Sequence, residues 1–286
     1  MKKRRSFSVG DVLIYAGLAF MALTVLLPMM YVISSSLTPY IEILKNDGIV
    51  LFPKNPTLDG YKTFFEESNV YRALGITVFI TVVGTTLQLL ISVLMAYPLS
   101  RKDLPGRGFF TMMVFIPMVF TAGLIPTYLV VKEVKMLNSI WSMVIPGVVS
   151  SYNLMILKSF FQTMDVGYIE AARIDGASEW RTLFSILLPL SLPALCTVGL
   201  FGAVSYWNTY YAYVYYISDN NLATLQVLLK RVIASSESML FEVDVEIPSM
   251  TLKMAAVVVT ALPIMLVYPF LQKYFIQGVT LGGVKG

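Results

Sequence analysis

A charged segment between residues 158 and 181 carries the side chains best suited to polar chemistry, and it lies between two long apolar runs. Asp165 can cap a helix, because its carboxylate can accept a hydrogen bond from an unpaired amide of the first turn. Glu170 and Arg173 are one turn apart, a spacing at which helical side chains interact. Gly176 can adopt the left-handed conformation that ends a helix. The pattern predicts a short charged helix of about three turns.

This short helix has small side chains at Ala171 and Ala172, which would let another backbone approach it closely. A second helix is expected to begin near Ser178 and to enter the next apolar run, after a bend at Gly176. Such a charged, thin helix could dock in a groove of another protein. The alternative is a solvated loop whose surface helix only connects two apolar runs.

The chain lacks the groups that most enzymatic or metal chemistry would need. It has no histidine, which removes the commonest general base and the commonest metal ligand. Its single cysteine, Cys196, allows no intrachain disulfide and suggests neither redox nor zinc chemistry. A phosphate-binding loop of the form GxxxxGKS or GxxxxGKT is missing from the sequence. We therefore expect no catalytic residues, no metal site and no cofactor bound by this chain.

The composition predicts an integral membrane protein. Hydrophobic residues make up 57% of the chain and charged residues only 13%, with a mean hydropathy of +0.73, whereas about a quarter of the residues of a soluble domain are charged. A helical crossing needs about 20 apolar residues, and six runs without Asp, Glu, Lys or Arg are long enough. They lie between Asp11 and Glu42, Arg72 and Arg101, Arg107 and Lys132, Lys135 and Lys158, Arg181 and Asp219, and Lys253 and Lys273.

The sequence thus predicts an all-α polytopic membrane protein with six transmembrane helices. Pro189 and Pro193 lie near the start of the fifth run, so its helix is expected to begin with a kink. The sixth run is short and contains Pro263 and Pro269.

The basic residues predict an orientation for these helices. Twelve Lys and Arg residues fall on the side of both termini and of segment 158–181, against nine on the other side, and they are denser in the shorter loops. Cytosolic loops are enriched in Lys and Arg. We therefore expect a cytosolic N-terminus at 1–11, a transmembrane domain at 12–273 and a cytosolic C-terminal tail at 274–286, in the inner or plasma membrane of a cell.

Two longer loops then face outward, at about 36–72 and 219–253. The first contains FPKNPTLDGYKTFF, a turn-rich stretch typical of a small external structure. The second contains TLQVLLKRVIASS, an amphipathic run that indicates a helix at the outer membrane surface, although a plain connector fits equally well.

An aromatic stretch, SYWNTYYAYVYY at 205–216, follows the fifth apolar run. Aromatic rings stack on the apolar faces of sugars and hydroxyl groups bond to their polar edges, so these residues could line a sugar pathway. The alternative is an aromatic belt at the membrane interface. The pathway candidates are Tyr206, Trp207, Asn208, Tyr210 and Tyr211.

Several of these residues fall into a family pattern. The frame Glu170-Ala171-Ala172, then Gly176, then Leu188-Pro189 and Pro193, resembles the EAA signature of binding-protein-dependent ABC importer permeases, with further matches at Asp175, Ala177, Phe184 and Ile186. The C-terminal stretch QKYFIQGVTLGGVKG, residues 272–286, is similar to the tail of carbohydrate-uptake permeases like the second permease of the maltose transporter. Trp207-Asn208 recurs at the matching place of that family's fifth span.

The resemblance implies a type I ABC importer permease fold and a subunit that forms half of a pore for sugars, with oligosaccharides favoured. It implies a second permease subunit, two ATPase subunits that use ATP and Mg, an extracellular or periplasmic solute-binding protein, and no nucleic acid. The implied coupling helix contains Glu170, Ala171, Ala172, Asp175 and Gly176. The implied ATPase-contacting tail contains Gly278, Thr280, Gly282, Gly283 and Lys285.

An ion-coupled carrier or a channel without an ATPase is the alternative. Carriers of this kind usually place ionisable residues within the membrane, whereas the six runs contain none. Backbone carbonyls and hydroxyls could still bind sodium. Neither alternative explains the charged segment around Glu170.

Overall fold

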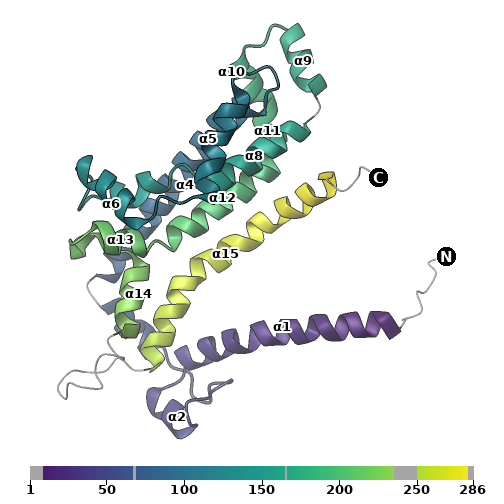
Figure 1. Ribbon diagram of the computed structural model, residues 1–286. Coiled ribbons are helices and arrows are strands. Elements are labelled where there is room, and N and C mark those ends of the chain that lie inside the picture. The colour runs from purple at the N-terminus through teal and green to yellow at the C-terminus, as the bar shows by residue number, and fades with distance from the viewer. Residues whose placement is uncertain (1–8, 67–68, 165, 235–249, 283–286) are drawn as a thin grey trace. The chain divides into compact units, whose positions relative to one another are not determined.

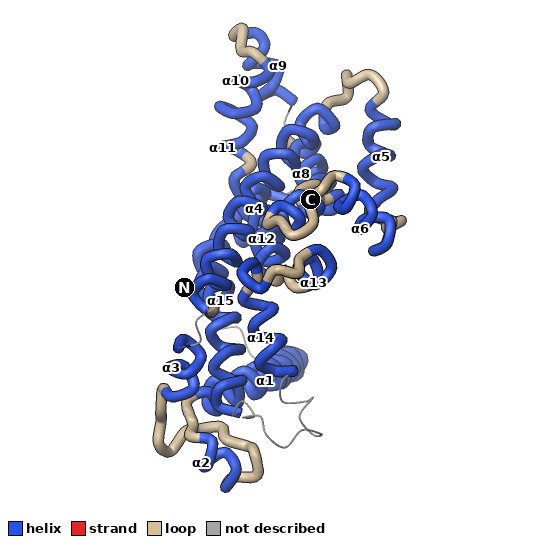
Figure 2. Tube along the Cα trace, turned by 90° about the vertical axis from the view of Figure 1, so that its left-hand side faces the viewer, coloured by secondary structure: helices blue, strands red, loops and turns tan. Residues whose placement is uncertain are grey.

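The protein is helical throughout the residues that the computed structural model describes, which are 9–66, 69–164, 166–234 and 250–282. Within these ranges no β-strand is formed, and only helices and loops are drawn in Figure 2. The predicted all-α class is therefore confirmed. The chain divides into two compact units, residues 1–70 with 229–262 (unit 1) and residues 71–228 with 263–286 (unit 2). We describe each unit by itself.

Fifteen α-helices are described in this part of the chain, together with short 3-10 and π-helical stretches. In order, the α-helices are α1 Val9–Ser36, α2 Tyr40–Lys45, α3 Asp59–Glu66, α4 Val70–Ser100, α5 Arg107–Val119, α6 Leu124–Glu133, α7 Trp141–Val144, α8 Ser151–Thr163, α9 Val166–Ile174, α10 Glu179–Arg181, α11 Leu188–Leu190, α12 Leu192–Trp207, α13 Tyr211–Tyr216, α14 Leu225–Ala234 and α15 Met250–Gly282 (Figure 1). The 3-10 stretches are Ile145–Gly147 and Asn220–Leu222, and the π-helical stretch is Thr182–Leu187.

In unit 1, the end of α1, helix α3 and the start of α15 pack together. The Thr251 hydroxyl donates to the carbonyl of Thr38 over 2.7 Å. Gly60 of α3 lies so close to the same residue that a Cβ there would be 2.9 Å from the Thr251 carbonyl oxygen. The hydroxyls of Ser36 and Tyr61 are 2.7 Å apart. The turn-rich stretch predicted after residue 36 is therefore an ordered structure that includes α2 and α3.

The core of unit 2 forms where α4, α8 and α12 meet the segment between α10 and α12. Its buried side chains include Val93, Leu157, Leu187 and Val198. Helices α4 and α12 approach closely because α12 has a glycine at the contact. A Cβ at Gly202 would lie 2.2 Å from the side-chain oxygen of Gln88. Small residues at such contacts are typical of helix packing within membranes.

Three of the six apolar runs form single helices long and apolar enough to cross a membrane, Gly10–Ser36, Val70–Ser100 and Met250–Pro269. The other three are each divided between two segments at an angle. The angles are 116° between Arg107–Val119 and Leu124–Glu133, 43° between Trp141–Gly147 and Ser151–Thr163, and 82° between Glu179–Leu190 and Leu192–Trp207. By length and composition, the described residues supply six spans only if each bent pair is one span.

Two of the three bends have local causes. The kink predicted from Pro189 and Pro193 is found at Ser191, where the 82° change of direction occurs between the two prolines. Gly123 has a positive φ of 83° just before α6, a conformation that favours glycine.

The sixth helix is longer than its apolar run, since α15 continues to Gly282 and the boundary predicted after residue 273 falls inside it.

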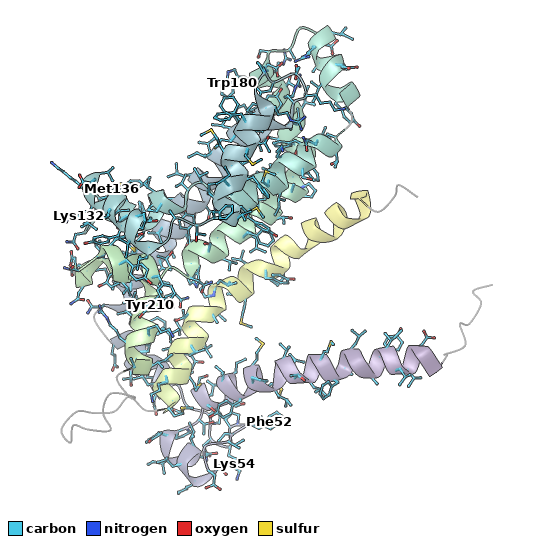
Figure 3. The ribbon with its side chains drawn as sticks, viewed as in Figure 1. Phe52, Lys54, Lys132, Met136, Trp180 and Tyr210 are labelled. Atoms are coloured by element: carbon cyan, nitrogen blue, oxygen red, sulfur yellow. The ribbon has the colours of Figure 1, made fainter. Side chains whose placement is uncertain are left out.

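Unit 2 carries two projecting regions at opposite ends. Helix α9 lies beyond α10 and α11 at one end, and α13 lies at the other, as Figures 1 and 2 both show. Figure 3 labels a residue near each of these ends, Trp180 on α10 and Tyr210 before α13. The coupling residues expected from the sequence fall at the first end and the aromatic pathway candidates at the second.

Candidate functional site

Helix α9 ends as the sequence predicts. Gly176 has a φ of +74°, its amide donates to the Arg173 carbonyl over 3.0 Å, and the Ala177 amide donates to the Ala172 carbonyl over 2.9 Å. These two bonds form a Schellman motif, in which a left-handed glycine lets the last carbonyls of a helix find donors. The expected N-cap, Asp165, lies outside the described residues.

The second helix begins where predicted. The Ser178 side chain caps α10 by accepting a hydrogen bond from the Arg181 amide over 3.3 Å. From there the chain continues through the π-helical stretch Thr182–Leu187 and α11 to the bend at Ser191. Gly176 thus lies between the fixed end of α9 and the start of α10, which Ser178 caps.

The motif residues of α9 divide between two faces. Ala172 is 4% exposed and Ile169 packs against the core of unit 2, so this face rests on the chain itself. Glu170 and Ala171 are exposed, as are Asp175 and Gly176 just beyond the helix. The small side chain of Ala172 therefore allows close packing within the chain. The small side chain of Ala171 lies on the exposed face, where it would let the backbone of another protein approach the helix closely.

Two exposed apolar side chains on α9 were not singled out from the sequence. Ile174 is 85% exposed and Tyr168 is 56% exposed. No local signal separates them from Ile169, an apolar residue of the same helix that packs against the core. Apolar side chains on a projecting helix are the groups that gain most when a partner covers them.

Arg173 ties the end of α9 to two other elements. Its Nη2 atom lies 3.3 Å from Asp103 in the loop between α4 and α5, and 3.0 Å from Glu179 at the start of α10. The hydroxyl of Tyr97 on α4 donates to the same glutamate. Arg173 therefore does not pair with Glu170, its neighbour one turn away on the helix surface. Instead it forms a bridge from α9 to Asp103 in the α4–α5 loop and to Glu179 on α10.

The bridge is an exposed electrostatic cluster. Arg101 donates to the Asp103 carboxylate over 3.4 Å and, as the main cause, holds the pKa of that carboxyl below its ordinary value, with smaller effects from the Asp103 backbone and from Arg173. The carboxylates of Glu179 and Asp103 both raise the pKa of Arg173, and Glu179 has the larger effect. Because the side chains of Arg173, Asp103 and Glu179 are about half exposed, water and salt weaken these pairs. The bridge fixes the direction of α9 more than it stabilises the fold.

Two cavities flank this bridge. One of about 480 Å³ is lined on α4, α10 and the α4–α5 loop, and its wall includes Tyr97, Arg101, Glu179 and Trp180. The other, of about 370 Å³, includes Lys102, Gln162 and Glu170. The Nη1 atom of Arg101 is buried without a hydrogen-bond partner. No group of three or more His, Cys, Asp or Glu residues that could hold a metal ion occurs among the described residues.

The aromatic end buries two of its predicted residues. Tyr206 is 4% exposed and its hydroxyl donates to the Val144 carbonyl over 3.0 Å. A Cβ at Gly84 would lie 2.7 Å from the Tyr206 ring, so this glycine makes room for the tyrosine. Trp207 is also buried. In this conformation the Tyr206 side chain packs inside unit 2, whereas Trp207, although buried, is among the residues that line a small apolar cavity of about 150 Å³.

The other three aromatic-end candidates are accessible. The Asn208 side-chain oxygen accepts a hydrogen bond from Gln226 over 3.0 Å. Tyr210 and Tyr211 contact each other edge to face at 5.2 Å between ring centroids, and Tyr211 stacks on Tyr215 at 5.8 Å. The accessible part of the predicted pathway is therefore a row of tyrosine rings on and before α13.

The predicted tail residues are only partly described. Gly278, Thr280 and Gly282 lie in the last turns of α15. Gly283 and Lys285 lie outside the described residues.

Comparison with known proteins supports the resemblance seen in the sequence. A family model described as "Binding-protein-dependent transport system inner membrane component" matches residues 88–281. The Bacillus subtilis polygalacturonan/rhamnogalacturonan transport system permease protein YtcP is 42% identical over 96% of this chain and 98% of its own length. The arabinooligosaccharides transport system permease protein AraQ of Halalkalibacterium halodurans is 28% identical over 99% of this chain and 100% of its own length.

A solved structure agrees with these relatives. One chain from a bacterial ABC transporter involved in the import of the acidic polysaccharide alginate matches with a TM-score of 0.83 and 28% identity. The match covers 95% of this chain and 100% of that chain. The likeness therefore extends over both units and is not confined to the charged segment. The chain belongs to the family of binding-protein-dependent transport system inner membrane components, the non-catalytic permease subunits of ABC transporters.

Proposed function

We propose that this chain forms half of the pore of an ATP-driven sugar importer and that α9 couples the pore to the ATPase subunits. The observation that carries the proposal is the pairing of two features on α9. Its outer face exposes Glu170, Ala171 and Ile174, and its end is tied to the rest of unit 2 through Arg173. A helix that is open on one side and anchored on the other can transmit a displacement.

The proposed topology has six spans, counted as three long helices and three bent pairs. Both termini and segment 158–181 face the cytosol, and the stretches at about 36–72 and 219–253 face outward. The excess of Lys and Arg on the proposed cytosolic side supports this orientation. The protein is then a multi-pass component of the inner or plasma membrane.

The proposed mechanism is mechanical. ATP and Mg bind to the two partner ATPase subunits, whose closure moves α9 of this chain and the equivalent helix of a second permease subunit. Rigid-body rocking of the membrane helices then exchanges inward-facing and outward-facing cavities. Each ligand shifts this equilibrium only by its difference in affinity for the two states, so the solute-binding protein outside and ATP inside must each prefer one state.

Oligosaccharides are the proposed substrates. The relatives named above are permeases for polygalacturonan or rhamnogalacturonan and for arabinooligosaccharides, and the solved neighbour takes part in alginate import. Among the pathway candidates, Asn208, Tyr210 and Tyr211 are accessible for sugar contacts. Trp207 lines a small apolar cavity, and Tyr206 would need a change of conformation. Acidic and neutral oligosaccharides should be tested side by side, because polygalacturonan and alginate both carry carboxylates.

The C-terminal residues are proposed to reach the ATPase subunits as well. Gly278, Thr280, Gly282, Gly283 and Lys285 are the candidates. Family membership gives the carrier or channel alternative no support, and the presence of a family-type segment around Glu170 argues for an ATPase partner.

The test replaces one exposed side chain on α9. The transporter is assembled with its second permease and ATPase subunits, and ATPase retention and transport are measured for Ile174→Asp. A charge placed in a covered apolar contact should cost about 2 kcal/mol or more, which is roughly a thirtyfold loss of ATPase affinity. The matched control is Ile41→Asp on α2, where an isoleucine is 67% exposed on the proposed outer side.

The control should retain the ATPase as the unchanged protein does. Full retention of the ATPase by Ile174→Asp would contradict the coupling role of α9. Equal loss from both variants would point to a general defect in membrane assembly.

A further inference from the structure

Lys158 is a charged residue in an unusual position. It lies on α8, it is 8% exposed, and within the described residues no carboxylate forms an ion pair with it. Burying an ammonium group without a counterion is unfavourable. Such a lysine is normally matched by an anion.

A second cation lies beside it. Arg107 is the first residue of α5 and lines, with Lys158, a cavity of about 360 Å³ between α5 and α8. The Nε atom of Arg107 donates to the Leu99 carbonyl over 3.0 Å, which holds the side chain in place. Within the described part of the chain, its terminal nitrogens form no hydrogen bond or ion pair. The cavity walls contain no Asp or Glu. They are formed by Arg107, Gly108, Thr111, Met112, Phe115 and Lys158.

Two further features of this cavity favour an anion. Helix α5 has 13 residues and begins at the cavity, and its N-cap, Gly106, supplies no side-chain cap. The positive end of the helix dipole therefore adds to the two charges. Thr111 offers a hydroxyl as a further donor. The two cations, the hydroxyl and the helix start form a built site for a phosphate group.

The surroundings indicate the source of that phosphate. Arg107 begins the third charge-free run and Lys158 ends the fourth, so in the proposed topology both lie at the cytosolic boundary of the membrane. Met112 and Phe115 follow on α5 and are exposed, which provides apolar surface next to the charged site. Basic pockets between membrane helices at this depth bind anionic lipid head groups.

We propose that the cavity between α5 and α8 binds the phosphate group of an anionic phospholipid, with Lys158 and Arg107 as its ligands and with an acyl chain along Met112 and Phe115. This inference uses the proposed orientation but not the coupling role of α9. Lipid binding is measured without transport, so the two can fail separately.

The experiment measures lipid retention by the full chain. Delipidated protein in detergent is titrated with phosphatidylglycerol or phosphatidylcholine, and bound lipid is counted by native mass spectrometry. Phosphatidylglycerol should bind at one saturable site, and Lys158→Met and Arg107→Gln should each weaken it by about tenfold, the effect of losing one charged hydrogen bond. Lys102→Gln, which removes an exposed lysine in the neighbouring loop, should leave the affinity unchanged.

Several results would overturn the proposal. These are unchanged phosphatidylglycerol affinity in both variants, equal binding of phosphatidylcholine, or displacement of the lipid by millimolar inorganic phosphate, which would assign the site to a free anion. Loss of the lipid when the second permease subunit binds would assign the site to an acidic group of that partner. If Lys158→Met does not accumulate, two other variants test the proposal. Arg107→Gln changes a less buried residue and should weaken lipid binding, whereas Lys158→Arg keeps the charge and should keep the lipid.

Discussion

The two ends of unit 2 are held together by different kinds of contact. At the α9 end, half-exposed charges of Asp103, Arg173 and Glu179 make the connection. At the end that carries α13, the buried Tyr206 ring of α12 packs beside Gly84 and its hydroxyl donates a hydrogen bond to the Val144 carbonyl of α7. The comparison teaches that the charged contacts of α9 can be altered without unfolding the protein, because they lie in water, whereas the buried Tyr206 ring cannot be removed without a large loss of stability.

The largest effect expected from this comparison is at Tyr206. Tyr206→Ala should destabilise unit 2 by about 3 to 5 kcal/mol, because it leaves a cavity the size of an aromatic ring and an unpaired buried carbonyl. Thermal unfolding in detergent measures the loss. Tyr206→Phe keeps the ring and should cost only about 1 kcal/mol. A small effect of Tyr206→Ala would show that the α13 end is not held by this residue.

A smaller and local effect is expected at Gly176. Gly176→Val forces a branched residue into a left-handed conformation, at a cost of about 1 to 2 kcal/mol. A Cβ at this position meets no atom within 4 Å, so the effect is backbone strain and not a clash. We expect about a tenfold loss of transport, with the unfolding temperature lowered by only a few degrees. Gly176→Asn, which tolerates this conformation, should recover most of the transport. Equal transport by Gly176→Val and the unchanged protein would argue that the end of α9 is not fixed.

The bridge at Arg173 should matter less than the glycine. Arg173→Gln removes the charge that joins Asp103 and Glu179, and because these pairs are exposed we expect about a threefold loss of transport. Asp103→Asn should have a similar effect, and the double variant should be no worse than either single one. Fully additive losses would show that the two residues act independently. The effect of Arg173→Gln should also shrink at high salt.

The smallest effect on folding is expected at Tyr211. Tyr211→Ala removes an exposed ring and should change stability by less than about 0.5 kcal/mol. If the tyrosine row contacts sugar, the same variant should raise the substrate concentration needed for half-maximal uptake, since a stacked ring contributes about 1 kcal/mol. Unchanged uptake would leave the row as an aromatic belt at the membrane interface.

The sequence was most informative where neighbouring residues decide the structure. Gly176 and Ser178 were predicted as helix-ending and helix-starting residues, and the kink near Pro189 and Pro193 was also predicted, because caps and proline effects act over one turn. The family pattern, from Glu170 to Pro193, could also be recognised because its residues are close together in the sequence.

The sequence was least informative where distant residues meet. Nothing local shows that Arg173 bonds to Asp103, 70 positions away, instead of interacting with Glu170. Composition could not distinguish the buried Tyr206 from the exposed Tyr211, since burial depends on the space beside Gly84. The 116° angle between α5 and α6 was missed because the charge-free run continues through it.

The central claim is that the outer face of α9 contacts an ATPase on the cytosolic side. Site-directed cross-linking tests this claim most directly. A cysteine is introduced as Ala171→Cys in a Cys196→Ser background, with Tyr211→Cys at the other end of unit 2 as the control. The account predicts that only the α9 cysteine cross-links to the ATPase and that it reacts with an impermeant thiol reagent only from the cytosolic side. No cross-link from position 171, or labelling of that position from outside the cell, would contradict it.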